Sequence, residues 1–233
     1  MLTRTEGVTA VVPAGGLGRR MQTDVPKQFI DIGGKPVFIR TLDKLDQCRD
    51  IRSIIVVIPS AYIVLSQQLI ETHHIRKVIQ IVAGGMERQD SVWNGLQVLP
   101  AKTNLVLVHD AVRPFVSVQK ISESIRAARK YGAAILAVSS RNTIKQVDDG
   151  WVVRTLERNK LWQVQTPQVF KKAWILDAYE KAKKDGICST DDSMLVERLG
   201  KKVKVVVGEE TNIKMTTQED LAMARVLLDD EPS

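Results

Sequence analysis

The sequence is poor in cysteine and in aromatic residues, and both shortages exclude classes of protein. The 233 residues include only two cysteines, Cys48 and Cys188, and no C-x-x-C pair. A disulfide framework and a thiolate zinc cluster are therefore excluded, and a reduced, cytoplasmic location is expected. Aromatic residues make up 5% of the chain, which leaves little surface for stacking nucleic-acid bases.

Long hydrophobic runs are also lacking. No stretch approaches the roughly 18 apolar residues that a bilayer-spanning helix needs, so no membrane segment is expected. Residues 1–7 carry no basic region followed by a long apolar stretch, so no signal peptide is expected either.

The net charge of +7 comes from lysines and arginines that are scattered rather than gathered in a block. Such a chain suits small phosphorylated metabolites better than nucleic acid. We therefore expect no nucleic-acid partner. A nucleic-acid-binding module is the alternative, and a salt series would identify it because phosphate-backbone binding weakens steeply with salt.

Short apolar runs alternate with longer amphipathic segments along the chain. This alternation predicts βαβ crossovers and an α/β fold, a mainly parallel sheet with helices on both faces. The length suits a single domain over residues 1–233. Strands are expected at 9–13, 53–58, 78–82, 105–109, 133–138 and 203–207, and helices at 36–45, 61–72, 90–99, 118–131, 171–184, 191–199 and from 217 onward.

Residues 139–168 break this alternation. Asp148-Asp149-Gly150 is a hairpin-turn signal between two strand-like segments, 143–147 and 151–156. An isolated hairpin is marginal in water, so it must pack on something. We expect a two-stranded β-arm that packs on a partner subunit; packing on its own domain is the alternative.

The first predicted strand opens into a glycine-rich loop over residues 15–18, followed by the basic residues Arg19, Arg20 and Lys27. Without Cβ atoms the backbone can bend sharply and approach a ligand, and successive N–H groups then form an anion site. This combination predicts a polyphosphate site. Met21 stands where a dinucleotide fingerprint needs its third glycine, which disfavours the alternative of a nicotinamide-dependent reductase, and the P-loop pattern is also incomplete.

Asp110 follows a strongly apolar predicted strand. Ligands of parallel sheets bind at the carboxyl ends of the strands, so Asp110 and the glycine-rich loop are expected at one edge. Mg²⁺ takes one or two carboxylates plus substrate phosphates, which makes Asp110 the candidate metal ligand. We expect Arg113 to pair with Asp110 or to hold its loop, and His109 to be a structural hydrogen-bond partner.

Three further segments carry candidate ligands. Gly84 to Ser91 leads into a helix and suits either phosphate binding or a plain capped turn. Arg158 can clamp a phosphate or carboxylate through two hydrogen bonds, and Lys214 is a second candidate phosphate ligand. Thr190, before Asp191-Asp192, belongs either to a helix cap or to a substrate hydroxyl contact.

In this order the segments resemble the 2-C-methyl-D-erythritol 4-phosphate cytidylyltransferase family of the non-mevalonate isoprenoid pathway. The resemblance runs from Pro13 to Leu221 and implies a Rossmann-like nucleotidyltransferase fold, a homodimer formed through a projecting β-arm, Mg²⁺, and the substrates CTP and a sugar-alcohol phosphate. The matching motifs are Ala14-Gly15-Gly16-x-Gly18-x-Arg20-Met21, Pro26-Lys27-Gln28, Gly84-Gly85-x-x-Arg88-x-x-Ser91-Val92, Val108-His109-Asp110-Ala111-x-Arg113-Pro114, Arg158-Asn159-x-Leu161-Trp162, Thr166-Pro167-Gln168, Thr190-Asp191 and Asn212-Ile213-Lys214.

The resemblance also implies roles for individual residues. Catalytic roles fall to Arg20 and Lys27, which stabilise charge at the α-phosphate of CTP, and to Arg158 and Lys214, which position the acceptor phosphate. Nucleotide binding is implied for Pro13, Ala14, Gly15, Gly16, Gly18, Gly84, Gly85, Arg88, Ser91 and Ala111, acceptor binding for Arg113, Thr143, Thr166 and Thr190, and metal binding for Asp110.

Two positions depart from the family's common pattern. Gly15 and Val112 both stand where the family commonly has alanine. The sister family of ribitol 5-phosphate cytidylyltransferases shares most of these motifs and tolerates such changes. Cytidylyl transfer is unaffected, and ribitol 5-phosphate stays open as the alternative acceptor.

Overall fold

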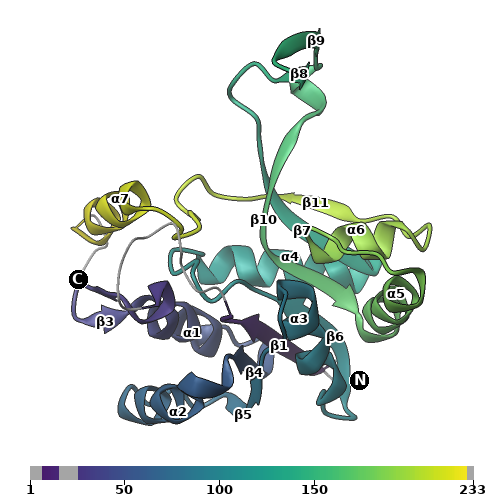
Figure 1. Cartoon of the computed structure of the whole chain (residues 1–233). Coiled ribbons are helices and arrows are strands. Elements are labelled where there is room, and N and C mark those ends of the chain that lie inside the picture. The colour runs from purple at the N-terminus through teal and green to yellow at the C-terminus, as the bar shows by residue number, and fades with distance from the viewer. Residues whose placement is uncertain (1–6, 16–25, 230–233) are drawn as a thin grey trace.

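Seven strands form the central sheet of the chain (Figure 1). The structure is a computed structural model, and it describes residues 7–15 and 26–229. The strands are β1 (Gly7–Pro13), β4 (Ile51–Ile58), β5 (Val78–Ala83), β6 (Thr103–Val108), β7 (Ala133–Ser139), β10 (Trp162–Lys171) and β11 (Lys204–Val207). Their order is β11-β7-β10-β6-β1-β4-β5. Six run parallel, and β10 runs antiparallel to both of its neighbours.

Helices cover both faces of this sheet, which confirms the predicted α/β fold. One face carries α1 (Val37–Gln47), α2 (Ile63–Thr72) and α4 (Val118–Tyr131); the other carries α3 (Arg88–Gln97), α5 (Lys172–Asp185) and α6 (Asp192–Glu197). The alternation of a strand divides its side chains between the two cores: Ala10 and Val12 pack in the first, and Val11 in the second. Within residues 7–15 and 26–229, no helix has the length and apolarity to cross a membrane.

A third, smaller apolar cluster lies beside the carboxyl edge of the sheet. It joins α7 (Gln218–Asp229) to Ile32 of the short strand β2 (Asp31–Ile32) and to Val37 at the start of α1; β3 (Lys35–Pro36) pairs with β2. Met215 is fully buried in this cluster, and its N–H donates to the carbonyl of Val112. The segment before α7 is therefore pinned next to the loop that follows β6. Two single 3-10 turns complete the fold on this side, η2 (Lys27–Phe29) and η3 (Ser60–Tyr62).

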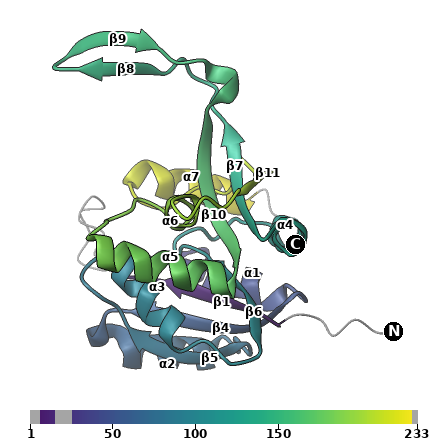
Figure 2. The same cartoon turned by 90° about the vertical axis from the view of Figure 1, so that its right-hand side faces the viewer.

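A hairpin projects from the body of the molecule (Figures 1 and 2). It consists of β8 (Lys145–Asp148), β9 (Trp151–Thr155) and the turn η4 (Arg158–Lys160), and every residue of both strands is exposed. Asp149 and Gly150 have φ angles of 44° and 80°. Positive φ at both central residues is the geometry that Asp-Gly favours in a two-residue hairpin turn, so this turn is read directly from the sequence.

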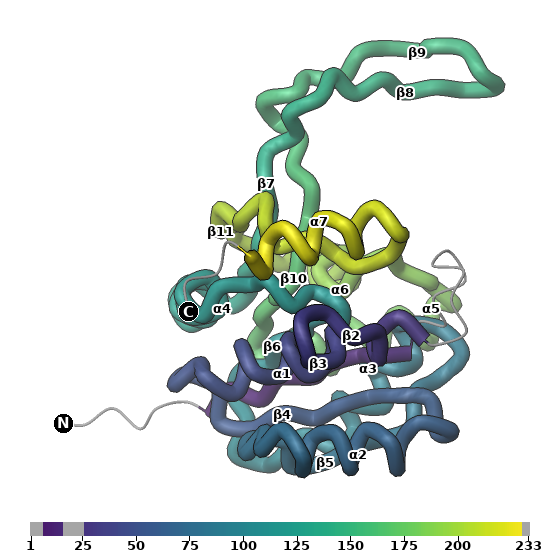
Figure 3. The backbone as a smooth tube through the Cα atoms, turned by 90° about the vertical axis from the view of Figure 1, so that its left-hand side faces the viewer, coloured from purple at the N-terminus to yellow at the C-terminus, as the bar shows by residue number. Residues whose placement is uncertain are grey.

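Strand β10 was not among the strands expected from the sequence. Residues 165–168 are polar and contain Pro167, yet Gln165 to Phe170 are buried between β6 and β7. The register with β7 shifts between Val164 and Gln168, and this irregularity accommodates the proline inside a central strand. The tube view shows β7 and β10 rising together from the sheet into the hairpin (Figure 3).

Candidate active site

The turns predicted to bind a nucleotide meet at the carboxyl edge of the sheet. Ala14, just after β1, donates its N–H to the carbonyl of Val57 over 2.7 Å. Ala111 donates its N–H to the carbonyl of Pro13 over 3.3 Å. These bonds continue the pairing beyond the ends of the strands and hold together the turns that follow β1 and β6 and the end of β4. The prediction that the glycine-rich loop and the segment after His109 share one edge is confirmed for the start of that loop, residues 13–15.

The hydroxyl of Ser91 lies at the centre of these turns. Its Oγ accepts a hydrogen bond from the N–H of Gly85 at 3.1 Å and donates to the carbonyl of Glu87 at 3.2 Å. A Cβ atom at Gly84 would stand 3.0 Å from this oxygen, and one at Gly15 would stand 3.4 Å away. Glycine at position 84 therefore leaves room for the Ser91 hydroxyl to pack against the turn that follows β5. The predicted residues Gly16, Gly18 and Arg20 lie outside the described residues.

A polar cavity of about 440 Å³ opens beside these turns, between β10, α6 and the segment before α7. Val164, Gln165, Gln168, Asp191, Ser193, Met194 and Glu197 form part of its lining. The remaining residues that line it were predicted as ligands from the sequence: Arg88, Asp110, Arg113, Thr166, Thr190 and Lys214. Arg88, predicted for the nucleotide, thus lies on the wall of the polar cavity.

Asp110 is the centre of charge in the polar cavity. Its Oδ1 lies 3.1 Å from Nε of Arg88, and its Oδ2 lies 2.9 Å from Nζ of Lys214 and 3.6 Å from Nε of Arg113. Burial by itself would raise the pKa of Asp110, but the three cations hold that pKa far below its ordinary value. Asp110 is consequently ionised at any physiological pH and fixes three cationic side chains around one point.

Asn212 explains how Lys214 reaches this cluster. The side chain of Asn212 is fully buried, and its Nδ2 donates to the carbonyl of Thr166 at 2.9 Å. The backbone carbonyl of Asn212 accepts a hydrogen bond from NH1 of Arg113 at 2.7 Å. The segment is thereby held between β10 and the loop after β6, and Lys214 is directed at Asp110.

His109 has a structural role, as the sequence analysis expected. Its Nε2 lies 3.2 Å from the carbonyl of Arg113, so Nε2 carries the proton and donates. Its Nδ1 then accepts from the hydroxyl of Thr166 at 2.9 Å, while that hydroxyl accepts from the N–H of Asp110. Complete burial lowers the pKa of His109 from 6.5 to about 4, although the charge of Asp110 opposes the shift. A neutral imidazole therefore braces the cluster.

This histidine predicts a loss of stability in mild acid. Because the folded-state pKa is below the unfolded one, unfolded chains bind the proton first, and the free energy of unfolding falls as pH drops from 6.5 towards 4. The expected loss at pH 5 is on the order of 2 kcal/mol. Urea unfolding at pH 7 and pH 5 measures it. His109→Gln should show a smaller fall, and an equal fall in both proteins would contradict the assignment.

The cap of α6 accounts for the residues around Thr190. Asp191 accepts the N–H of Met194 at 3.1 Å, the capping role that the sequence suggested. Asp192, next along the chain, is instead buried and binds Arg88 with both oxygens, at 3.2 and 2.8 Å. Tyr179 of α5 donates to the same carboxylate. Neither Asp192 nor Tyr179 was predicted as a site residue. Asp192 looks like an acidic residue in the first turn of a helix, and a lone tyrosine in an amphipathic helix gives no signal of its own.

Three predicted residues lie away from the polar cavity. Thr143 and Arg158 are exposed on the hairpin arm, where NH1 of Arg158 donates to the carbonyl of Arg141 at 3.0 Å. Lys27 begins η2 after Pro26, is half-buried and does not line the cavity. Within a single chain, Thr143 and Arg158 therefore do not reach the polar cavity.

Asp110 is the only carboxylate among the residues predicted to bind ligands at the polar cavity. In the part of the chain that the structure describes, no group of three or more His, Cys, Asp or Glu residues could hold one. Both oxygens of Asp110 are engaged by cations. These residues do not fit a metal held by protein ligands alone. They are compatible with Mg²⁺ only where substrate phosphates provide most of its ligands, and metal binding at Asp110 stays a prediction.

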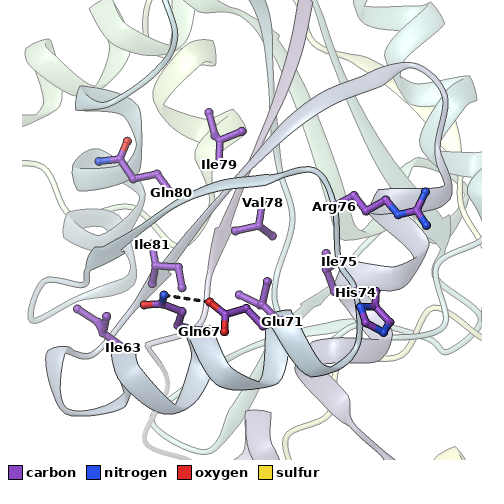
Figure 4. Close-up of a pocket in the computed structure, with 11 residues that line it drawn as sticks. Ile63, Gln67, Glu71, His74, Ile75, Arg76, Val78, Ile79, Gln80 and Ile81 are labelled. Carbon is purple, nitrogen blue, oxygen red and sulfur yellow. Dashed lines mark hydrogen bonds between the residues drawn. The ribbon is translucent and has the colours of Figure 1, made fainter.

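A second cavity, of about 530 Å³, lies between α2 and the edge strand β5 (Figure 4). Its lining is mainly aliphatic and includes Ile63, Ile79 and Ile81, with His74 and Arg76 at one end. Gln67 and Glu71 are hydrogen-bonded to each other at 3.0 Å. This groove is larger than the polar cavity but gathers none of the predicted ligands, so we place the candidate active site at the polar cavity.

Comparison with known proteins agrees with this geometry. Residues 8–230 match the family model of 2-C-methyl-D-erythritol 4-phosphate cytidylyltransferase. A protein of that name from Geobacillus thermodenitrificans is 47% identical over 219 residues, covering 94% of this chain and 96% of the relative. Another, from Syntrophus aciditrophicus, is 48% identical over 226 residues, with 96% and 97% covered.

Solved structures give the same result. The crystal structure of 4-diphosphocytidyl-2C-methyl-D-erythritol synthase from Anaerococcus prevotii superposes with a TM-score of 0.87 at 37% identity and covers 97% of both chains. The crystal structure of 2-C-methyl-D-erythritol 4-phosphate cytidylyltransferase from Thermus thermophilus gives 0.80 at 31% identity, covering 96% of this chain and 99% of that one. The predicted nucleotidyltransferase fold is confirmed.

Proposed function

Because the chain belongs to the 2-C-methyl-D-erythritol 4-phosphate cytidylyltransferase family, we propose that it joins CTP and 2-C-methyl-D-erythritol 4-phosphate. The products are 4-diphosphocytidyl-2-C-methyl-D-erythritol and pyrophosphate, in isoprenoid precursor synthesis. The observation that carries this proposal is the meeting of the nucleotide-binding turns with the cationic cluster around Asp110 at one edge of the sheet.

The reaction is an in-line displacement at phosphorus. A phosphate oxygen of the acceptor attacks the α-phosphorus of CTP, the bond from that phosphorus to the bridging oxygen breaks, and pyrophosphate leaves with the electron pair. A phosphate monoester is already anionic near neutral pH, so no covalent intermediate is required. Catalysis is then mainly positioning and electrostatic stabilisation.

The cationic cluster provides the positioning on the acceptor side. Lys214 and Arg113 point at Asp110 within the polar cavity, and a phosphate bound there would be attracted by both. Asp110 holds the two cations in fixed places through its carboxylate. Thr190, which also lines the cavity, presents a hydroxyl group for the sugar-alcohol chain, whereas the hydroxyl of Thr166 is engaged by His109 and by the N–H of Asp110.

Mg²⁺ enters this proposal with the nucleotide. When bound to CTP it would offset charge on the triphosphate, and Asp110 is the carboxylate that would lie beside it. Most of its ligands would be phosphate oxygens and water, which is the mode that Mg²⁺ favours.

Pyrophosphate release tests the function directly. CTP would be incubated in parallel with 2-C-methyl-D-erythritol 4-phosphate and with ribitol 5-phosphate. We expect release with the first acceptor and little with the second. Release with ribitol 5-phosphate alone would establish the alternative acceptor, and release with neither would overturn cytidylyl transfer.

We also propose that two copies of the chain pair through the hairpin arm. Trp151 on β9 is 79% exposed, and Val152 and Val153 beside it are exposed as well. Apolar side chains of this kind on an otherwise solvated hairpin favour a protein partner. The same arm carries Arg158 and Thr143, which do not line the polar cavity of their own chain. In a dimer they would serve the polar cavity of the neighbouring copy.

A mixing experiment tests this arrangement. Arg158→Ala and Lys214→Ala are each expected to be strongly impaired, with a raised acceptor KM for Arg158→Ala. In a mixed dimer one site would carry both defects and the other neither, so co-expression of the two variants should restore about a quarter of wild-type activity. Each variant expressed alone is the control. No recovery in a mixture shown to contain mixed dimers would place Arg158 in its own chain's site.

A further inference from the structure

A chain of polar contacts, buried at Tyr179 and Asp192, connects α5 to the cationic cluster. The hydroxyl of Tyr179 donates to Oδ1 of Asp192. NH1 and NH2 of Arg88 donate to Oδ1 and Oδ2 of the same carboxylate, at 3.2 and 2.8 Å. Nε of Arg88 donates to Oδ1 of Asp110 at 3.1 Å. Asp192 is 1% exposed, so its carboxylate is shielded from solvent and its charge is balanced by these contacts.

All three nitrogens of the Arg88 guanidinium donate hydrogen bonds in this chain of contacts. It binds one carboxylate bidentately and a second through Nε, a geometry that only arginine's planar fork allows. Arg88 is also the first residue of α3, where the helix dipole disfavours a positive charge. Burial by itself would lower the pKa of Arg88, but Asp192 and Asp110 raise it well above its ordinary value. The two carboxylates therefore hold Arg88 in a place that it would not otherwise occupy.

This chain of contacts also connects the nucleotide side of the active site to its acceptor side. Arg88 begins the helix that contains Ser91, whose hydroxyl closes the nucleotide-binding turn. Its guanidinium reaches Asp110, which holds Lys214 on the acceptor side. On the far side, the ring of Tyr179 stacks on Trp93 of α3 at 6.1 Å between centroids and 6° between planes. Helices α3, α5 and α6 are thus fixed to one another behind the cluster.

We propose that Asp192 and Tyr179 are positioning residues for cytidylyl transfer. They fix the guanidinium of Arg88, which fixes Asp110 and, through it, Lys214 and Arg113 at the polar cavity. Neither residue lines the polar cavity. Their effect reaches the reaction as the placement of the acceptor phosphate relative to the nucleotide turn. This inference rests on the proposed function of the same site.

The test uses Asp192→Asn and Tyr179→Phe in the full-length protein, assayed well below the melting temperature of each variant. In Asp192→Asn an amide NH₂ would face the Arg88 guanidinium, and one carboxylate charge would be lost. We expect kcat/KM for the acceptor to fall about 10- to 100-fold, with KM for CTP changed less than about threefold. Tyr179→Phe removes one hydrogen bond and should lower the same ratio about three- to tenfold.

A third variant separates geometry from charge. Arg88→Lys retains the charge but cannot bridge two carboxylates. It should lose as much acceptor kcat/KM as Asp192→Asn, and the double variant should lose little more, because both changes break one chain of contacts. Additive losses would show that the two residues act separately and would overturn the proposal.

Asp50→Asn is the matched control. It breaks an ion pair with Arg129 of 2.8 Å that also lies partly buried, but before β4 and near the end of α4, away from the polar cavity. Both KM values and kcat should stay at wild-type levels in this control.

Three outcomes of the main test overturn the inference. An Asp192→Asn variant with wild-type kinetics and only a lower melting temperature would make the chain purely structural. An effect confined to the KM for CTP would assign Arg88 to the nucleotide alone. Wild-type protein that releases no pyrophosphate would overturn the proposed function and this inference together, and the wild-type assay identifies that case first.

Discussion

Replacing Lys27 by alanine is expected to lower kcat by about 10²–10³, the loss typical when one donor that stabilises transition-state charge is removed. The displacement brings together two anionic reactants, and negative charge accumulates at the α-phosphate. The fold should survive the change, because the residues after Lys27 anchor the turn. Gln28 is buried, and the ring of Phe29 packs against Phe38 and Tyr62, with centroids 6.0 and 5.3 Å away.

Steady-state pyrophosphate release and a thermal melt of the same preparation measure this effect. Lys35→Ala is the matched control, since Lys35 is also a lysine in this part of the chain and pairs with Asp43 at 2.7 Å on the surface. Such exposed pairs contribute about 0–1 kcal/mol, so the control should keep both its activity and its melting temperature. Near-normal turnover in Lys27→Ala would remove Lys27 from the catalytic set.

The second large effect is expected from Asp110→Asn. The change leaves Lys214, Arg113 and Arg88 facing one another without their shared carboxylate. Removing one partner of a buried ionic cluster costs about 3–5 kcal/mol. Lys214 and Arg88 are partly exposed, so we expect a loss of about 3 kcal/mol in the free energy of unfolding at pH 7. Activity should fall with it, because the cations lose their fixed positions.

The pH dependence of this variant provides an independent test. The folded-state pKa of Asp110 lies below its ordinary value of 3.8, so its stabilising contribution is complete above about pH 4 and is lost as pH falls further. The difference in unfolding free energy between wild type and Asp110→Asn should thus shrink in strong acid. The change due to His109 occurs at higher pH, between 6.5 and 4, so the two effects are separable. A difference that is constant down to pH 2 would contradict the assignment.

Features that depend on neighbours in the chain could be predicted from the sequence. The Asp149-Gly150 turn is one, because its positive φ angles restrict which residues fit. The alternation of apolar runs with amphipathic helices is another, and it was enough to predict the layers of the fold. The position of Asp110 after a buried strand also followed, since the carboxyl ends of parallel strands share an edge.

Features that depend on distant contacts could not be predicted in the same way. The residues of β10 are polar, and their burial follows from pairing with β6 and β7; Gln168 lies opposite both Val108 and Ile135. Asp192 looks like a first-turn acid of a helix, and only the approach of α3 to α6 makes it the partner of Arg88. Packing between elements, which local patterns do not encode, decides such roles.

The hairpin arm begins and ends at one place in the sheet, because Ser139 on β7 lies directly opposite Trp162 on β10. The residues between them leave the sheet and return to it at the same place. Lengthening or shortening this connection costs little in loop-closure entropy and leaves the pairing of β7 with β10 in register. Changes in the length of β8 and β9 should therefore leave the sheet edge of the same chain intact and affect only what the arm contacts in a neighbouring copy.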